Sequence, residues 1–273
     1  MKKIVLVAVL FFSLFSLTQA QNFYTRLGVG VSGGTSSNLD ILYSYSGTES
    51  DQVVTVVPVG FGRGFTGVAA FGYKPLKYLS LELGISQFMG LPRIADSVMK
   101  MPGGSAIEAK VKGNMLSLQP SIVIHPGFEK IDPYARIGFI LGIRPVVNAM
   151  AKATISGTNP PVESEAIRHY YGGVAVGLNA AMGVNWTLNS LISVYAECSF
   201  NSINYSPKYS EVVFYEKDGV DQLSTLTVKE TKTEYYGSIH PDEVIPDTSP
   251  DKQLRKSLPF SNAGFSMGIL FNF

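Results

Sequence analysis

The chain ends on the stretch Leu258–Phe273, which reads LPFSNAGFSMGILFNF and alternates between two kinds of side chain. Successive side chains of an extended strand point to opposite faces. One face of this strand would carry large apolar residues, namely Phe265, Met267, Ile269, Phe271 and Phe273. The other face would carry small or polar residues and one leucine, namely Gly264, Ser266, Gly268, Leu270 and Asn272. We therefore predict a strand with one apolar side and one small or polar side.

The same alternation recurs along the chain. It is cleanest in Leu79–Ser86, where leucine or isoleucine alternates with serine, glutamate or glycine. Earlier segments with this pattern are Phe23–Ser32, Phe61–Tyr73, Leu79–Ser86, Leu116–Ile124, Tyr134–Arg144, Gly173–Met182 and Ile192–Asn201. A strand of about 9–11 residues crosses the hydrocarbon of a bilayer when it is tilted. Strands that are apolar toward lipid and polar toward a lumen are typical of outer-membrane barrels.

The connections between these segments alternate in length. Short turns are expected at Lys74–Lys77, His125–Gly127 and Asn185–Asn189, whereas long polar excursions include Pro145–Ala166 and Ser206–Ser257. Outer-membrane barrels have short periplasmic turns and long extracellular loops, and they close because unpaired backbone groups in lipid are costly. We therefore predict an all-β fold, an eight-stranded antiparallel up-and-down transmembrane β-barrel with long extracellular loops and both termini in the periplasm.

A barrel of ten strands is the alternative that the sequence leaves open. It would use Glu211–Tyr215 and Gln222–Thr227 as a further hairpin around Lys217-Asp218-Gly219. These flanks are shorter and more charged than a bilayer-crossing strand, so we interpret them as a hairpin above the membrane.

The first 20 residues have the features of an export signal. Lys2 and Lys3 precede the apolar run Ile4–Leu17, and the small-residue site Thr18-Gln19-Ala20 follows it. We predict a cleaved signal peptide over residues 1–20 and a barrel domain over residues 21–273. The predicted location is the outer membrane of a Gram-negative bacterium.

Composition argues against several other classes of protein. The formal net charge is +1, so no concentrated basic surface indicates nucleic-acid binding. The single cysteine, Cys198, cannot form an internal disulfide, and we interpret it as a small apolar side chain. Gly28–Gly33 matches the G-x-G-x-x-G nucleotide fingerprint, but its glycines lie inside a predicted strand and no helix follows. We expect no cofactor, and glycines that make room in a narrow lumen explain this motif better.

A family resemblance supports the barrel. The residues that carry it are the leader ending at Ala20, the piece Asp132-Pro133-Tyr134-Ala135-Arg136-Ile137-Gly138, and the terminal Phe271-Asn272-Phe273. Over Asn22–Phe273 the chain resembles the small outer-membrane barrels that include OmpX and the OmpA transmembrane domain, and particularly the barrel proteins of Bacteroidetes-type bacteria. The resemblance implies the architecture and no active site, and we expect no peptidoglycan-binding domain after the barrel.

Charged residues fall on the inward side of four predicted strands. These residues are Arg26, Glu82, Arg136 and Glu197. A charge that faces lipid at mid-depth would cost ~2–4 kcal/mol for arginine, so we place all four in the lumen, where opposite charges pair. Because side chains just fill an eight-stranded barrel, we interpret the four as a polar plug. An ionic gate or a proton-handling site is the functional alternative.

The histidines do not indicate an enzyme. We expect His125 to be solvated in a periplasmic turn and His240 to be solvated in the last loop. His169 precedes two tyrosines and lacks the His-x-Ser pattern of outer-membrane lipid A deacylases. No cluster of side chains has the spacing of metal ligands. We therefore predict a non-enzymatic protein without cofactor or metal.

The terminal strand also predicts how the protein is assembled. Its apolar face resembles the signal that barrel-insertion machinery recognises, and we assign that role to Phe265, Ile269, Phe271 and Phe273. Aromatic residues beside the short turns predict an interfacial girdle of Tyr73, Tyr78, Tyr134, Trp186, Phe271 and Phe273.

The expected role is structural or interactive, through the extracellular loops. The expected partners are outer-membrane lipid, lipopolysaccharide, the insertion machinery and an extracellular protein or polysaccharide, with no nucleic acid. The alternative function is a narrow porin or a transporter of small hydrophobic ligands. The sequence does not identify the ligand, the oligomeric state or whether the lumen conducts.

Overall fold

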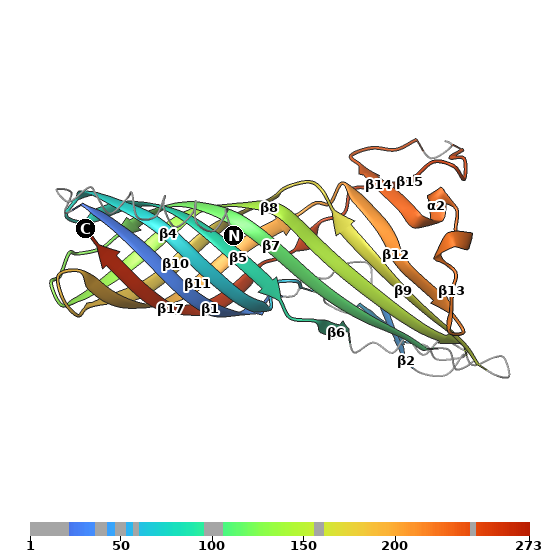
Figure 1. Ribbon diagram of the computed structural model, residues 1–273, viewed down its shortest axis with the longest axis horizontal. Coiled ribbons are helices and arrows are strands. Elements are labelled where there is room, and N and C mark those ends of the chain that lie inside the picture. Colours follow the sequence, from blue (N-terminus) through green and yellow to red (C-terminus); the bar gives the residue numbers. More distant parts are fainter. Residues whose placement is uncertain are drawn as a thin grey trace, which may run out of the picture.

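The computed structural model describes residues 22–35, 43–46, 53–56, 60–95, 106–155, 161–240 and 244–273. The predicted signal peptide, residues 1–20, lies outside these ranges. A closed antiparallel barrel occupies one end of an elongated molecule (Figure 1). Its strands, in the order in which they neighbour one another, are β1 (Phe23–Gly34), β4 (Gly64–Leu76), β5 (Leu79–Gly90), β7 (Ala106–Ile124), β8 (Ile131–Ile155), β10 (Ala175–Thr187), β11 (Ile192–Tyr205) and β17 (Asn262–Asn272).

The eight strands pair in one closed cycle, which includes the pair β7–β8 and the pair of the first and last strands. β1 and β17 run antiparallel from Tyr24 opposite Asn272 to Gly34 opposite Asn262. The amide of Phe273 donates to the carbonyl of Phe23 at 3.0 Å, so the first described strand and the chain end lie side by side. The eight-stranded prediction is confirmed, and no strand pair outside this cycle enlarges the barrel within the described residues.

The predicted two-residue alternation sets the two faces of the barrel wall. Outward side chains are exposed and apolar, for example Ile137 at 60%, Phe139 at 63% and Met182 at 72%. The residues next to them in the chain point inward and are buried, for example Arg136 and Ala181, which are both 5% exposed. The inward side chains are therefore buried, and the exposed surface of the barrel is an apolar belt.

Two expected long excursions, Pro145–Ala166 and Ser206–Ser257, contain more β-structure than the single hairpin expected within the second of them. β8 continues past the barrel to Ile155, and β7 accompanies it from Ala106. The strands β9 (Val162–Tyr171), β12 (Tyr209–Lys217), β14 (Lys232–Tyr236) and β15 (Asp251–Leu254) then add successively to the free edge of β8. We call this extension, with the distal halves of β7 and β8, the side sheet (Figure 1).

A β-bulge marks the boundary between barrel and side sheet. Asn114 pairs with Val146 but Leu116 pairs with Ile143, so Arg144 and Pro145 together oppose Met115. Arg144 has φ of 51° and is exposed, although the alternation that points Arg136 inward would point Arg144 inward as well. Proline has no amide hydrogen to donate to a ladder, and bulges tolerate it. Before the bulge the even-numbered residues of β8 point inward, and the extra residue shifts this to the odd-numbered ones. Val147 therefore points inward beyond the bulge and is 1% exposed.

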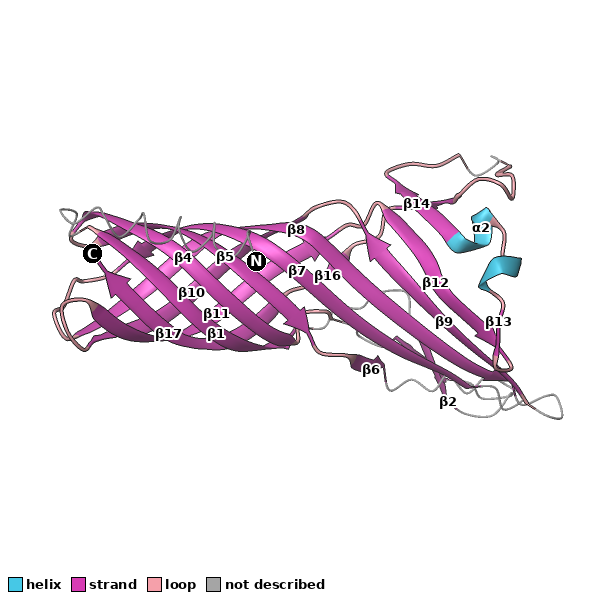
Figure 2. Ribbon diagram, in the orientation of Figure 1, coloured by secondary structure: helices cyan, strands magenta, loops and turns pink. Residues whose placement is uncertain are grey.

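The remaining elements are short (Figure 2). They are β2 (Tyr43–Ser46), β3 (Val53–Val56), β6 (Arg93–Ala95), β13 (Val220–Asp221), η1 (Leu223–Thr225), α2 (Val228–Thr231) and β16 (Leu258–Pro259). Asp218 and Gly219, with φ of 51° and 77°, form the expected turn after β12. Its returning strand is only the two residues of β13, so the flank Gln222–Thr227 proposed for a ten-stranded barrel is not a strand. Among the described residues, no helix is long and apolar enough to cross a bilayer.

Candidate functional site

Four charged residues form an alternating ring across the lumen. Arg26 comes from β1, Glu82 from β5, Arg136 from β8 and Glu197 from β11. These are every second strand of the eight, so like charges lie on opposite walls and unlike charges lie on successive ones. Side chains of alternate strands also share a layer in other closed barrels. All four are between 3 and 5% exposed, and we call them the charge ring.

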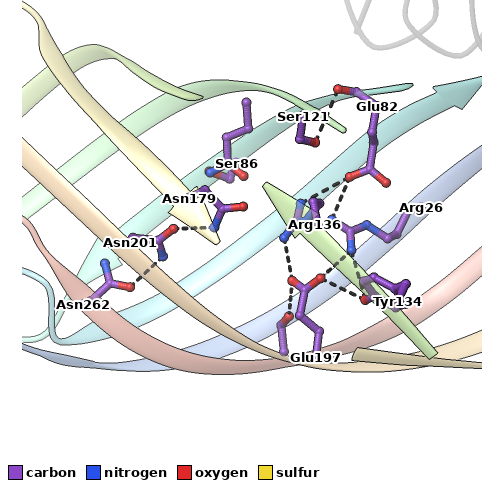
Figure 3. Close-up of polar contacts among 12 residues, drawn as sticks. Arg26, Glu82, Ser86, Ser121, Tyr134, Arg136, Asn179, Glu197, Asn201 and Asn262 are labelled. Carbon is purple, nitrogen blue, oxygen red and sulfur yellow. Dashed lines mark hydrogen bonds and ion pairs between the residues drawn. The ribbon is translucent and has the colours of Figure 1, made fainter. Parts of the chain in front are cut away.

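Each guanidinium of the charge ring contacts both carboxylates (Figure 3). Arg26 donates from Nη2 to Glu82 Oε1 and from Nη1 to Glu197 Oε2, both at 2.9 Å. Arg136 donates from Nη1 to Glu82 Oε1 at 3.2 Å and from Nη2 to Glu197 Oε1 at 2.6 Å. The alternation of side chains along each strand predicted that these four residues point inward, and the structure brings all of them together. Two positive and two negative side chains leave the ring with no net charge.

Three tyrosines surround the charge ring. Tyr24 donates to Glu82 Oε2 at 3.1 Å, and Tyr134 donates to Glu197 Oε2 at 2.9 Å. The guanidinium carbon of Arg26 lies 4.9 Å from the ring centre of Tyr195. Tyr134 is therefore a lumen residue at 7% exposure, which corrects its expected place in the interfacial girdle. Tyr73, Tyr78 and Trp186 are exposed as that girdle requires.

Each of these tyrosines lies opposite a glycine of the neighbouring strand. The pairs are Tyr24 with Gly72, Tyr134 with Gly183, and Tyr195 with Gly268. A Cβ added at Gly72 would lie 2.1 Å from the Tyr24 ring, and at Gly183 it would lie 2.6 Å from the Tyr134 ring. An aromatic ring that covers a cross-strand glycine pins strand register. The high glycine content thus makes room for the tyrosines that support the ring.

A second polar layer lies beyond the charge ring, toward the side sheet. Asn179 donates to Asn201 at 2.6 Å and Asn201 donates to Asn262 at 2.8 Å, across three adjacent strands (Figure 3). On the opposite wall Gln119 donates to Ser86 at 2.7 Å. The alternation within β10 and β7 points Asn179 and Gln119 inward, but it does not predict that the three asparagines form a row.

An apolar cluster lies at the end of the lumen where the side sheet begins. Its aromatic members, which we call the aromatic cap, are Phe61, Phe88, Tyr205 and Phe260. The rings of Phe61 and Phe260 stack at 5.6 Å, and the edges of the other two rings meet Phe260 at 6.2 and 6.0 Å. Phe260 is 1% exposed. The sequence prediction missed this cap, although Phe88 continues the inward series of Ser80, Glu82 and Ser86 in β5.

His125 is buried at the opposite end of the barrel, which corrects the expectation of a solvated histidine. Its Nε2 lies 3.1 Å from Ser80 Oγ, and its Nδ1 lies 2.9 Å from Asp132 Oδ2. These residue types match a hydrolase triad, but Ser80 is 1% exposed. Asp132 also accepts the amides of Gly127 and Phe128 at 2.9 and 3.0 Å, so the group ties the turn after β7 to β5.

The other two histidines lie outside the eight barrel strands. His169 lies in β9 of the side sheet rather than in a barrel strand, and His240 is exposed.

Phe265 and Ile269 face outward at 42% exposure, whereas Phe271 and Phe273 are partly buried at the end of β17. Their role in insertion stays a prediction. No three metal-ligating side chains gather within the ranges that the structure describes.

Comparisons with known proteins give distant similarities only. No protein-family model and no curated protein sequence matches the chain. Neisserial surface protein A aligns at 10% identity over 92% of this chain and 97% of its own, with a TM-score of 0.36. Ail of Yersinia pestis aligns at 10% identity over 92% and 99%, with a TM-score of 0.31. The outer membrane protease OmpT of Escherichia coli aligns at 10% identity over 93% and 98%, with a TM-score of 0.34. Identities this low transfer no residue role, ligand or activity.

Proposed function

We propose that the protein is a non-enzymatic outer-membrane barrel whose lumen is closed and whose side sheet is the part that meets other molecules. The observation that carries the proposal is the charge ring, in which buried side chains from four strands contact one another across the lumen. The aromatic cap closes the same lumen a second time. A barrel filled in this way offers no continuous path for a solute, so the scaffold serves to hold the side sheet above one end.

The apolar belt supports the membrane location. A surface of exposed leucine, isoleucine, phenylalanine and methionine around a closed barrel is unfavourable in water and suits lipid. Backbone groups of the wall are paired in a closed cycle of strands, as the bilayer interior requires.

Planar-bilayer conductance of the refolded protein tests the closed lumen. We expect no steady ion current through the wild-type barrel, because the charge ring and the aromatic cap lie one behind the other along its axis. A steady current would contradict the proposal and make the narrow transporter the better account.

The fluorescence of Trp186 tests the membrane location. It is the chain's single tryptophan, lies at the end of β10 and is 52% exposed on the outward side. Lipids that carry a quencher near the headgroup should reduce its emission more than lipids quenched at the bilayer centre. Quenching by aqueous iodide alone would contradict the membrane placement of this end.

A further inference from the structure

One face of the side sheet carries a cluster of hydroxyl groups beside two cations. Ser210 of β12 lies opposite Tyr170 of β9 and Thr233 of β14, so the three share a face, and Tyr235 follows two residues after Thr233. Ser210 and Thr233 are 1 and 3% exposed and form a polar floor. Arg168, two residues before Tyr170, lies on the same face.

Arg168 contacts this floor through hydroxyl groups alone. Its Nη1 donates to Thr233 Oγ1 at 3.2 Å and to Ser210 Oγ at 3.4 Å. Ser210 Oγ also shares a hydrogen bond with the Tyr235 hydroxyl at 3.1 Å. Within the described residues these hydroxyl groups give the guanidinium no negative partner, whereas every arginine of the charge ring contacts two carboxylates.

Lys256 brings a second positive charge to the same place. Its Nζ lies 5.5 Å from the ring centre of Tyr235, the ring whose hydroxyl meets Ser210. Burial, and then the neighbouring Arg168 guanidinium, lower the pKa of Lys256. The two cations are thus close enough to repel each other, and both keep part of their surface exposed to solvent.

No carboxylate neutralises this pair within the ranges that the structure describes, because neither Arg168 nor Lys256 forms an ion pair there. The carboxylate nearest by register is Asp251 of β15, opposite Thr233, and its Oδ2 accepts a hydrogen bond from Gln253 at 2.9 Å. Burial raises the pKa of Tyr170, as does the neighbouring Tyr235, so its hydroxyl stays a proton donor at neutral pH.

We propose that Arg168 and Lys256, over the hydroxyl floor of Ser210, Thr233 and Tyr235, bind a phosphate group. Arginine and lysine together with hydroxyl donors are the groups that recognise phosphate oxygens. Tyr170 lies opposite Val147 of the apolar cluster at the barrel mouth, so this face of the side sheet continues the inner wall of the barrel. The ligand reaches this face from solution. The site therefore opens toward the barrel axis and not toward the surrounding lipid. The inference rests on the proposed interaction role of the side sheet and names the chemistry of its ligand.

Titration calorimetry with inorganic phosphate tests the site on refolded full-length protein in a neutral detergent. We expect binding that sodium chloride of matched ionic strength does not reproduce, and at least a tenfold loss of affinity in Arg168→Gln with Lys256→Gln. Lys256→Gln alone should lose part of the affinity, and it changes a residue outside any strand, so the sheet keeps its pairing.

Lys232→Gln is the matched control, because Lys232 lies on the opposite face and pairs with Glu211 at 3.5 Å. Its phosphate affinity should equal that of the wild type. No phosphate binding by the wild type, or equal binding by the double variant, would overturn the proposal. The proposal would also fail if the protein bound phosphatidic acid in bicelles but not inorganic phosphate, because the inferred ligand comes from solution. These outcomes are independent of bilayer conductance, so the site and the closed lumen can fail separately.

Discussion

The charge ring and the aromatic cap occupy the same lumen and are held together by opposite physical means. The ring consists of ion pairs between 2.6 and 3.2 Å, made by residues that lie within barrel strands. The cap consists of aromatic packing, and two of its rings, Phe61 and Phe260, come from connections that lie beside the strands. Strand register alone positions the ring, whereas the cap depends on how the connecting segments fold back into the mouth.

This difference predicts different responses to mutation. A buried ion network is sensitive to charge balance, because removing one partner leaves an uncompensated charge in a desolvated site. Apolar packing is sensitive to volume, because the loss depends on the cavity that remains.

The largest expected effect comes from unbalancing the ring. Glu197→Ala leaves two guanidinium groups with one carboxylate and should lower the free energy of unfolding by ~3–5 kcal/mol. Arg136→Ala together with Glu197→Ala restores charge balance, because Arg26 and Glu82 remain paired at 2.9 Å. The double variant should therefore recover part of the stability, as measured by denaturant unfolding in detergent.

A second double variant separates charge balance from the loss of side chains. Arg26→Ala together with Arg136→Ala removes two residues of the ring but leaves two facing carboxylates, so it should show no recovery. Equal stability of the two double variants would show that packing, and not charge, dominates the ring.

Truncating the centre of the cap should have the next largest effect. Phe260→Ala removes the ring that touches three other aromatic rings and should cost about 3 kcal/mol, the low end for a buried phenylalanine. Phe265→Ala is the matched control, because it removes the same group from the outward face at 42% exposure. Phe260→Ala should not open an ion current, since the charge ring still closes the lumen. A current in this variant would make the cap the functional closure.

The smallest expected effect tests the glycines that support the ring. Gly72→Ala places a Cβ 2.1 Å from the Tyr24 ring, which must move away from Glu82, and should cost about 1–3 kcal/mol by overpacking. Gly67→Ala in the same strand meets nothing within 4 Å and should leave the unfolding midpoint unchanged. A loss of similar size in both variants would mean that alanine weakens the strand itself, independently of the tyrosine.

Sequence reasoning reached the barrel wall and the charge ring because both follow from a local rule. Alternation with period two assigns Arg26, Glu82, Arg136 and Glu197 to the inward face one strand at a time. Once four charges share a narrow closed lumen, their mutual contact follows from the cost of leaving any of them unpaired. No long-range information beyond barrel closure is needed for that step.

The side sheet lay beyond this reasoning because its formation depends on a single irregularity. Arg144-Pro145 reads equally well as the end of a strand or as a bulge within one, since proline is compatible with both. The choice depends on whether β7 continues alongside β8 and whether β9 finds the free edge, which are contacts between distant segments. The same holds for the aromatic cap, where Phe260 meets Phe61 from the other end of the chain.

By itself, therefore, the sequence determined for most positions of the barrel strands which side chains face outward and which face the lumen, because strand periodicity is local. Only the tertiary structure decided how the lumen is closed at its mouth, which tyrosine covers which glycine, and where Arg168 meets Lys256. Those features arise from pairing and packing across long loops, and alternation within one strand contains no information on what lies opposite it.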